Sequence, residues 1–159
     1  MSPMLRPDEF TCGSIAEAVP PSLVLPRTKY EHALLIGELD GRVNAVFLDA
    51  NFEYFAIEEG SDWAGLIVGN INLEVDESAL FDPNDGTGSV GALLRRGEEL
   101  CLLASSARRR PDPVTLLGGL PRLPPNERVG FYKWQITLGE GLDRRLLKPV
   151  DSRPSKLEA

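Results

Sequence analysis

Apolar and polar residues alternate along much of the first half of the chain, which indicates β-strands with one buried side. Residues 32–39 and 42–49 are rich in strand formers, and Asp40-Gly41 lies between them. An Asp-Gly pair favours a two-residue type I′ turn, because both central positions of that turn have positive φ. The pattern therefore predicts a β-hairpin whose strands pair directly outward from this turn.

Two further strands are predicted downstream of the hairpin. Residues 52–59 follow Ala50-Asn51, a poorer turn, and residues 63–76 alternate strictly from Ile67 onward. Gly69 lies inside that long strand, so a bend is expected there. Together with the hairpin, these segments predict an antiparallel meander.

The second half of the chain predicts shorter strands separated by proline-rich loops. Residues 93–104 predict a hairpin, although a helix over residues 89–104 fits the spacing of several apolar side chains as well. Residues 105–128 contain several prolines and are expected to be loops, among them a Pro-x-x-Pro sequence at residues 121–124. Strict alternation predicts a last strand over residues 129–138.

These elements predict a mostly β protein, a small antiparallel barrel or sandwich, with a mixed α+β arrangement as the alternative if the helix forms. Residues 1–31 are predicted to be an irregular, proline-rich arm. Within the arm, Ser14 and Glu17 have the spacing of a capping box, which predicts one short helical turn. Residues 32–141 are predicted to form a single β domain, and the polar residues 142–159 a flexible C-terminal tail.

The two predicted turns determine which side chains share a face of the sheet. With two-residue turns at Asp40-Gly41 and Ala50-Asn51, Val43 lies opposite both Glu38 and Glu58. Under this register both faces of the sheet are largely apolar, unlike a sheet with one side in water. Another layer or a partner subunit has to cover the second face, so the sequence predicts a homo-oligomer.

Composition and charge restrict the possible partners. The chain has 159 residues, which favours one domain, and it carries 24 acidic against 17 basic side chains, a net charge of −7. This balance disfavours nucleic acid and anionic membranes as partners, and no apolar run reaches the roughly 18 residues of a membrane span. Cys12 and Cys101 are far apart, and the start of the chain lacks a signal-peptide pattern, so we expect a cytoplasmic protein with reduced thiols.

Four side chains are candidates for catalysis. The predicted register places His32 opposite Asp49, within reach of an imidazole–carboxylate hydrogen bond. It also places Glu38 and Glu58 on one face about 9.5 Å apart, near the upper limit of roughly 6.5–9.5 Å for the carboxyl pair of inverting glycoside hydrolases. A cross-strand polar pair and two solvated glutamates explain the same residues without chemistry, and this interpretation is favoured.

No cofactor or metal site is predicted. Residues 82–86 supply oxygen ligands around a glycine, but their spacing departs from that of a calcium loop, and an Asn-Asp-Gly turn explains them equally well. Gly86, Gly88 and Gly91 have G-x-G-x-x-G spacing without the strand and helix that a nucleotide site needs.

The sequence therefore favours a non-catalytic intracellular β module that mediates self-association and binds a protein or small-molecule partner. The alternative is a small acid–base hydrolase or isomerase that uses His32, Asp49, Glu38 and Glu58. A concave pocket containing two or more of these four side chains would favour the enzyme.

Overall fold

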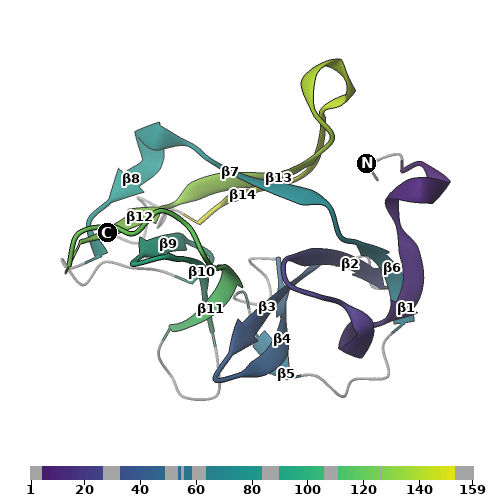
Figure 1. The fold of residues 1–159 in the computed structure, drawn as a ribbon, viewed down its shortest axis with the longest axis horizontal. Helices are drawn as coiled ribbons and strands as arrows, with labels where there is room; N and C mark the ends of the chain where they lie inside the picture. The colour runs from purple at the N-terminus through teal and green to yellow at the C-terminus, as the bar shows by residue number, and fades with distance from the viewer. Residues whose placement is uncertain are drawn as a thin grey trace, which may run out of the picture.

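Two antiparallel β-sheets pack against each other to form the fold, and the described part contains no long helix (Figure 1). The structure is a computed structural model that describes residues 5–26, 33–48, 54, 56–58, 64–83, 90–105, 111–125 and 127–152. The predicted mostly β class is confirmed as a sandwich, because the sheets do not close into a barrel.

The larger sheet has eleven strands within the described residues, in the order β1-β6-β2-β3-β11-β10-β9-β12-β8, with β4 and β5 extending from β3. Its strands are β1 (Thr11–Ser14), β2 (Ser22–Pro26), β3 (Leu34–Leu39), β4 (Arg42–Phe47), β5 (Ala56–Glu58), β6 (Ala64–Val68), β8 (Leu80–Phe81), β9 (Leu93–Arg96), β10 (Glu99–Ala104), β11 (Asp112–Leu117) and β12 (Arg128–Phe131).

The smaller sheet has three strands within the described residues, in the order β14-β13-β7. These are β7 (Ile71–Val75), β13 (Lys133–Leu138) and β14 (Arg145–Asp151). Short 3-10 turns accompany the strands, namely η1 (Pro7–Glu9), η2 (Ile15–Glu17), η4 (Glu77–Ala79) and η6 (Gly141–Asp143). The predicted N-terminal helical turn is confirmed as η2, which begins directly after Ser14.

The hairpin at Asp40-Gly41 is confirmed in turn and register. Asp40 has a φ of +53° and Gly41 a φ of +78°, as a type I′ turn requires. Leu39 pairs with Arg42 and Glu38 with Val43, so β3 and β4 pair directly outward from the turn.

The predicted register of the next strand is wrong by one residue. Ala56 pairs with Val46 and Ile57 with Ala45, whereas a two-residue turn at Ala50-Asn51 would have paired Ala56 with Ala45. Alternate positions of a strand belong to opposite faces, so this shift exchanges the faces that β5 positions occupy.

Two predicted long strands are each divided between the sheets. The chain leaves β6 at Gly69 and enters β7 in the smaller sheet, so the expected bend is a change of sheet. The segment 129–138 likewise divides into β12 of the larger sheet and β13 of the smaller one.

The positions that face the main core change parity at each break. Ile67 packs in the cluster on the far side of the larger sheet, whereas Ile71 and Leu73 pack against the main core. Tyr132 likewise packs in a separate cluster, whereas Trp134 lies in the main core, so the predicted common face of each long strand is wrong.

The hairpin predicted over residues 93–104 is confirmed, and the alternative prediction of a helix over residues 89–104 is wrong. β9 and β10 pair about a turn in which Gly97 has a φ of +50°.

Three segments expected to be irregular also contain strands. The N-terminal arm contributes β1 and β2, the proline-rich segment contributes β11, and the tail contributes β14. Pairing with neighbouring strands outweighs the local effect of proline where the proline ends a strand or lies at a sheet edge, as Pro149 does in β14. The division into one β domain stays a prediction.

Both faces of β3 and β4 are covered by this chain. Leu35 and Val46 lie in the main core between the sheets, together with Trp134 and Ile136 of β13. The opposite face packs against residues 5–26, which we call the N-terminal segment. Ile15 in this segment is 0% exposed. The apolar second face therefore needs no partner subunit to cover it. The homo-oligomer stays a prediction, but the uncovered apolar face no longer supports it.

Candidate functional site

Of the four residues proposed for acid–base chemistry, the structure places only positions 38 and 58, and the register separates these two across the sheet. His32 and Asp49 lie outside the described residues. Glu38 is exposed near the end of β3. Position 58 pairs with Asn44, the neighbour of Val43, and therefore belongs to the opposite face from position 38. The register argument that brought Glu38 and Glu58 together is wrong.

The glycine-rich segment is described only in part, because residues 84–89 lie outside the described residues. Gly91 has a structural role: a Cβ there would lie 2.5 Å from the Tyr54 ring, and its carbonyl accepts a hydrogen bond from Trp134 Nε1 at 2.8 Å. Within the described residues, no three His, Cys, Asp or Glu side chains gather to hold a metal ion. No helix found there is long and apolar enough to cross a membrane.

Cys101 does not have the environment of a reactive thiol. Its side chain lies in a buried cluster with Leu94 and Leu103, and burial raises the pKa of its thiol above the ordinary value. A neutral thiol is a weak nucleophile. Cys101 is therefore a packing residue of β10.

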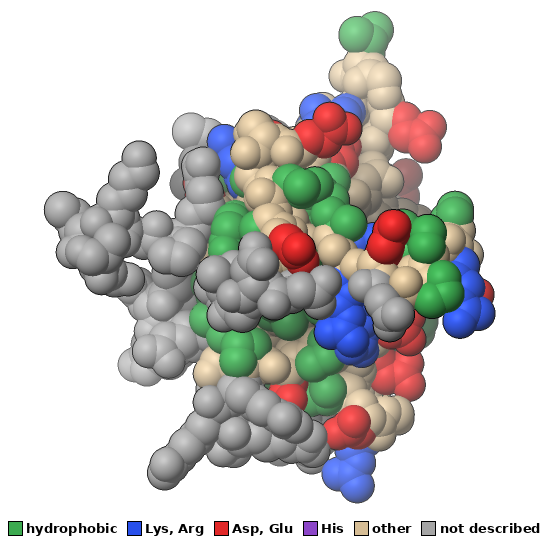
Figure 2. Space-filling view, turned by 90° about the vertical axis from the view of Figure 1, so that its left-hand side faces the viewer, with side chains coloured by type: hydrophobic (Ala, Val, Ile, Leu, Met, Phe, Trp, Pro, Cys, Tyr) green, Lys and Arg blue, Asp and Glu red, His purple; other side chains and the backbone are tan. Residues whose placement is uncertain are grey.

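The β13–β14 hairpin projects from the body of the molecule (Figure 1). We call residues 139–144, which connect its two strands, the tip. Leu142 at the tip is 110% exposed, and Leu146 at the start of β14 is 50% exposed. Figure 2 shows the projection at the top of the molecule, ending in a hydrophobic side chain. The hairpin thus presents apolar surface to solvent at its far end.

Backbone geometry fixes the shape of the tip. Gly139 and Gly141 have φ values of +81° and +58°, a region that glycine adopts without strain. The Asn72 side chain on β7 donates a hydrogen bond to the Gly139 carbonyl at 3.0 Å. Within the tip, the amide of Asp143 donates to the Glu140 carbonyl at 3.0 Å, which closes the η6 turn.

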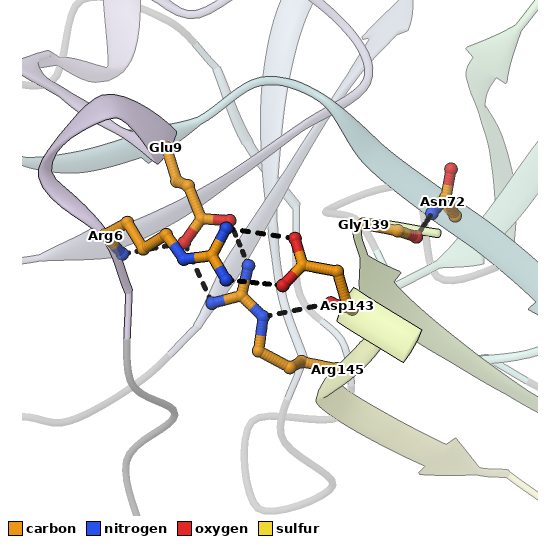
Figure 3. Close-up of polar contacts among 6 residues, drawn as sticks. All are labelled: Arg6, Glu9, Asn72, Gly139, Asp143 and Arg145. Atoms are coloured by element: carbon orange, nitrogen blue, oxygen red, sulfur yellow. Dashed lines mark hydrogen bonds and ion pairs between the residues drawn. The ribbon is translucent and has the colours of Figure 1, made fainter. Parts of the chain in front are cut away.

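Four charged side chains, which we call the clamp, join the hairpin to the N-terminal segment (Figure 3). The Arg6 guanidinium donates to the Asp143 carboxylate, with Nη1 3.0 Å from Oδ2. Arg145 donates to both oxygens of Glu9, with Nη1 2.8 Å from Oε1. The Glu9 side chain is only 13% exposed, and hydrogen bonds from Arg145 and from the Arg6 amide lower its pKa from 4.5 to about 2. Glu9 is thus ionised, and its carboxylate accepts hydrogen bonds from the Arg145 guanidinium and from the Arg6 amide.

A second carboxylate fixes the hairpin to β7. Glu74 accepts hydrogen bonds from Arg144 Nε at 3.0 Å, Gln135 Nε2 at 2.9 Å and Thr137 Oγ1 at 3.0 Å. These donors, Arg144 foremost, lower its pKa from 4.5 to about 2. A carboxylate with so low a pKa is a poor proton donor near neutral pH, so Glu74 acts as a structural anchor.

A groove of about 460 Å³, which we call the proline groove, lies on the opposite end of the molecule from the tip. It is lined by residues 96–99, residues 122–125, Glu127 and Arg128. The Pro-x-x-Pro segment forms one wall and the β9–β10 turn the other. Figure 2 looks at the side of the molecule where β8, β9 and β12 lie, and it shows basic and acidic side chains close together there.

Sequence reasoning missed the clamp and the groove arginines. Arg6 and Asp143 are 137 positions apart, and Glu9 and Arg145 are 136 apart, so no local pattern connects them. The groove did leave a signal, since the Pro-x-x-Pro segment and the charged β9–β10 turn are both visible in the sequence. The sequence does not show that these two segments contact each other.

Comparison with known proteins places the chain beside proteins without an assigned activity. A family described as "Y4lG: Uncharacterised protein y4lG" matches residues 12–157. A curated protein of Sinorhizobium fredii (strain NBRC 101917 / NGR234), "Uncharacterized protein y4lG", is 40% identical over 154 residues, which cover 91% of each chain. No solved structure matches the chain significantly.

Proposed function

The chain belongs to the Y4lG family, and we propose that it is a non-catalytic binding module for a protein partner, with the β13–β14 hairpin as its contact element. The observation that carries this proposal is the fully exposed Leu142 at a projecting tip. A second exposed leucine, Leu146, lies on the same hairpin. The partner is a protein with an apolar pocket large enough for one leucine side chain.

The rigidity of the tip supports a binding role. The clamp, the Glu74 contacts and the Asn72–Gly139 hydrogen bond hold the hairpin at both its base and its tip. A contact element that is already ordered loses less conformational entropy on binding than a flexible loop. The polar contacts therefore contribute to affinity without touching the partner.

The state of several titratable groups in the described part of the chain supports a non-catalytic role. Glu9 and Glu74 are held ionised by arginines, Cys101 is buried with a raised thiol pKa, and Glu38 is exposed to solvent. General acid–base catalysis favours groups whose pKa is near the working pH.

We also propose that the protein meets its partner in the cytoplasm. The two cysteines, Cys12 and Cys101, are far apart in the sequence, and this agrees with a compartment where thiols stay reduced.

We test the proposal by placing the photo-crosslinker p-benzoylphenylalanine at residue 142, or at residue 19 as a control, in cells that express the protein. The cross-linked partner is identified and purified. The dissociation constant is then measured for wild type, Leu142→Ser and the matched control Val19→Ser, whose residue is 73% exposed elsewhere on the surface. We expect Leu142→Ser to weaken binding by about tenfold or more and Val19→Ser to leave it unchanged.

Three outcomes contradict the proposal: no adduct at position 142, an equal yield of the same adduct from position 19, or unchanged affinity of Leu142→Ser. An adduct between two copies of this chain would identify a second copy as the partner, in agreement with the predicted homo-oligomer. The mass in solution, measured by light scattering, then has to exceed the 17.4 kDa of one chain.

A further inference from the structure

Three arginines line the proline groove, and two of them have no side-chain partner among the described residues. Arg96 of β9 lies directly opposite Arg128 of β12 in the antiparallel register. Side chains at directly opposed positions have Cβ atoms about 4.5–5.5 Å apart, and like charges there destabilise the pair. Arg96 has Glu99 at 3.7 Å, whereas Arg128 forms no ion pair or hydrogen bond through its side chain with any described residue.

A third arginine faces the same groove from a fixed segment. The Leu123 amide donates to the Gly97 carbonyl at 3.1 Å, and the Leu120 amide donates to the Glu98 carbonyl at 2.9 Å. Arg95 adds hydrogen bonds to the carbonyls of Gly97 and Pro121. These contacts hold the segment that carries Arg122, which itself has no side-chain partner among the described residues.

From this arrangement we propose that the proline groove binds a small organic anion with one carboxylate or phosphate group. Guanidinium groups match the planar, bidentate geometry of such oxyanions. An oxyanion between Arg128, Arg96 and Arg122 would relieve the repulsion between the two opposed arginines. Leu123 and Pro124 of the groove wall provide apolar surface for the rest of the ligand.

The acidic side chains of the groove limit the charge of the ligand. Three glutamates, Glu98, Glu99 and Glu127, line the groove together with the three arginines. A polyanion would bring further negative charge against Glu98 and Glu127 and against a chain with a net charge of −7. A ligand with a single oxyanion and an apolar body avoids this repulsion.

The experiment titrates the ¹⁵N-labelled protein with phenyl phosphate, benzoate, inorganic phosphate and the polyanion heparin. It follows the amide resonances of residues 96–99, Leu120, Arg122 and Leu123. We expect saturable shifts in these residues for phenyl phosphate or benzoate, and weaker binding of inorganic phosphate, which lacks an apolar part. The comparison of the two aromatic anions decides between phosphate and carboxylate. Arg128→Gln and Arg122→Gln are each expected to weaken binding by about tenfold.

Lys148→Gln is the matched control, because it removes one positive charge from β14, outside the groove. It is expected to bind as wild type does. Arg128→Gln is expected to keep or raise the Tm of the ligand-free protein, since it removes one of two opposed like charges. Absence of saturable shifts, equal binding by Arg128→Gln and Lys148→Gln, or tighter binding of heparin than of phenyl phosphate would overturn the proposal.

Discussion

At the scale of single residues, two constraints meet at Gly139. Its φ of +81° lies in the left-handed region, and an added Cβ would lie 2.6 Å from the Asp143 carbonyl oxygen. Gly141, two residues later, has a φ of +58° but open space around a Cβ. A side chain at position 141 would therefore meet only backbone strain, whereas a side chain at position 139 would meet both backbone strain and a steric clash.

We predict that Gly139→Ala destabilises the protein more than Gly141→Ala. Gly141→Ala adds only the strain of a left-handed alanine, about 1–2 kcal/mol, whereas Gly139→Ala adds a backbone clash to the same strain. Urea unfolding of both variants measures the difference in the free energy of unfolding. Equal losses for the two variants would mean that the tip relaxes around the new Cβ.

At the scale of elements, the hairpin depends on charge pairs from distant parts of the chain. Glu9 receives Arg145 of β14, and Glu74 receives Arg144 of the tip. Each carboxyl has a lower pKa in the folded protein than its ordinary 4.5. The unfolded chain therefore binds more protons than the folded protein between pH 4.5 and about 2, and the stabilisation by these pairs is lost as the pH falls through that range.

We predict that Glu9→Gln removes part of this acid sensitivity. Above pH 4.5 the variant is less stable than wild type. The two free energies of unfolding approach each other as the pH falls from 4.5 and converge below about pH 2, where Glu9 is protonated in wild type as well. Chemical unfolding at a series of pH values measures both curves. Glu77→Gln is the control, since Glu77 is exposed and forms no side-chain hydrogen bond or ion pair with any described residue. Curves for Glu9→Gln and wild type that stay parallel would contradict the role assigned to the clamp.

At the scale of the whole molecule, the N-terminal segment acts as an additional layer of the sandwich. Ile15 and Ala18 cover the face of β3 and β4 that points away from the main core. The segment also supplies β1 and β2 to the larger sheet. Its removal would expose a continuous apolar face, and such faces promote association.

We predict that Ile15→Ala lowers the free energy of unfolding by about 2–5 kcal/mol, as expected for a fully buried isoleucine. Val19→Ala, four residues later and 73% exposed, should change it by no more than about 0.5 kcal/mol. Denaturant unfolding gives both values. A small effect of Ile15→Ala would show that the N-terminal segment does not cover the second face in solution.

Local chemistry explains which parts of the fold could be predicted. Asp40-Gly41 and Gly97 adopt positive φ in tight turns, a property of those residues themselves, so both hairpins were predictable. The turn after Ser14 also depends on a short local pattern. The register of β5 was not predictable, because it depends on the length of a connection with no strong turn signal.

Long-range pairing explains which parts could not be predicted. β14 lies in the polar C-terminal segment that was expected to be flexible, yet it pairs with β13 from Arg145 to Asp151. The clamp joins residues more than 130 positions apart, and the groove arginines meet only because β9 pairs with β12. None of these contacts has a signal in the residues around it.

The sequence by itself determined the class of this protein and its local turns, since alternation and turn chemistry act between residues close in the chain. Tertiary structure alone decided that the alternating segments divide between two sheets at Gly69 and before Lys133. It also decided that the N-terminal segment covers the second apolar face, and that the β13–β14 hairpin is held as a projection. These outcomes depend on which apolar faces meet and which charges pair across the whole chain, and the free energy of such contacts arises only once distant strands are in place.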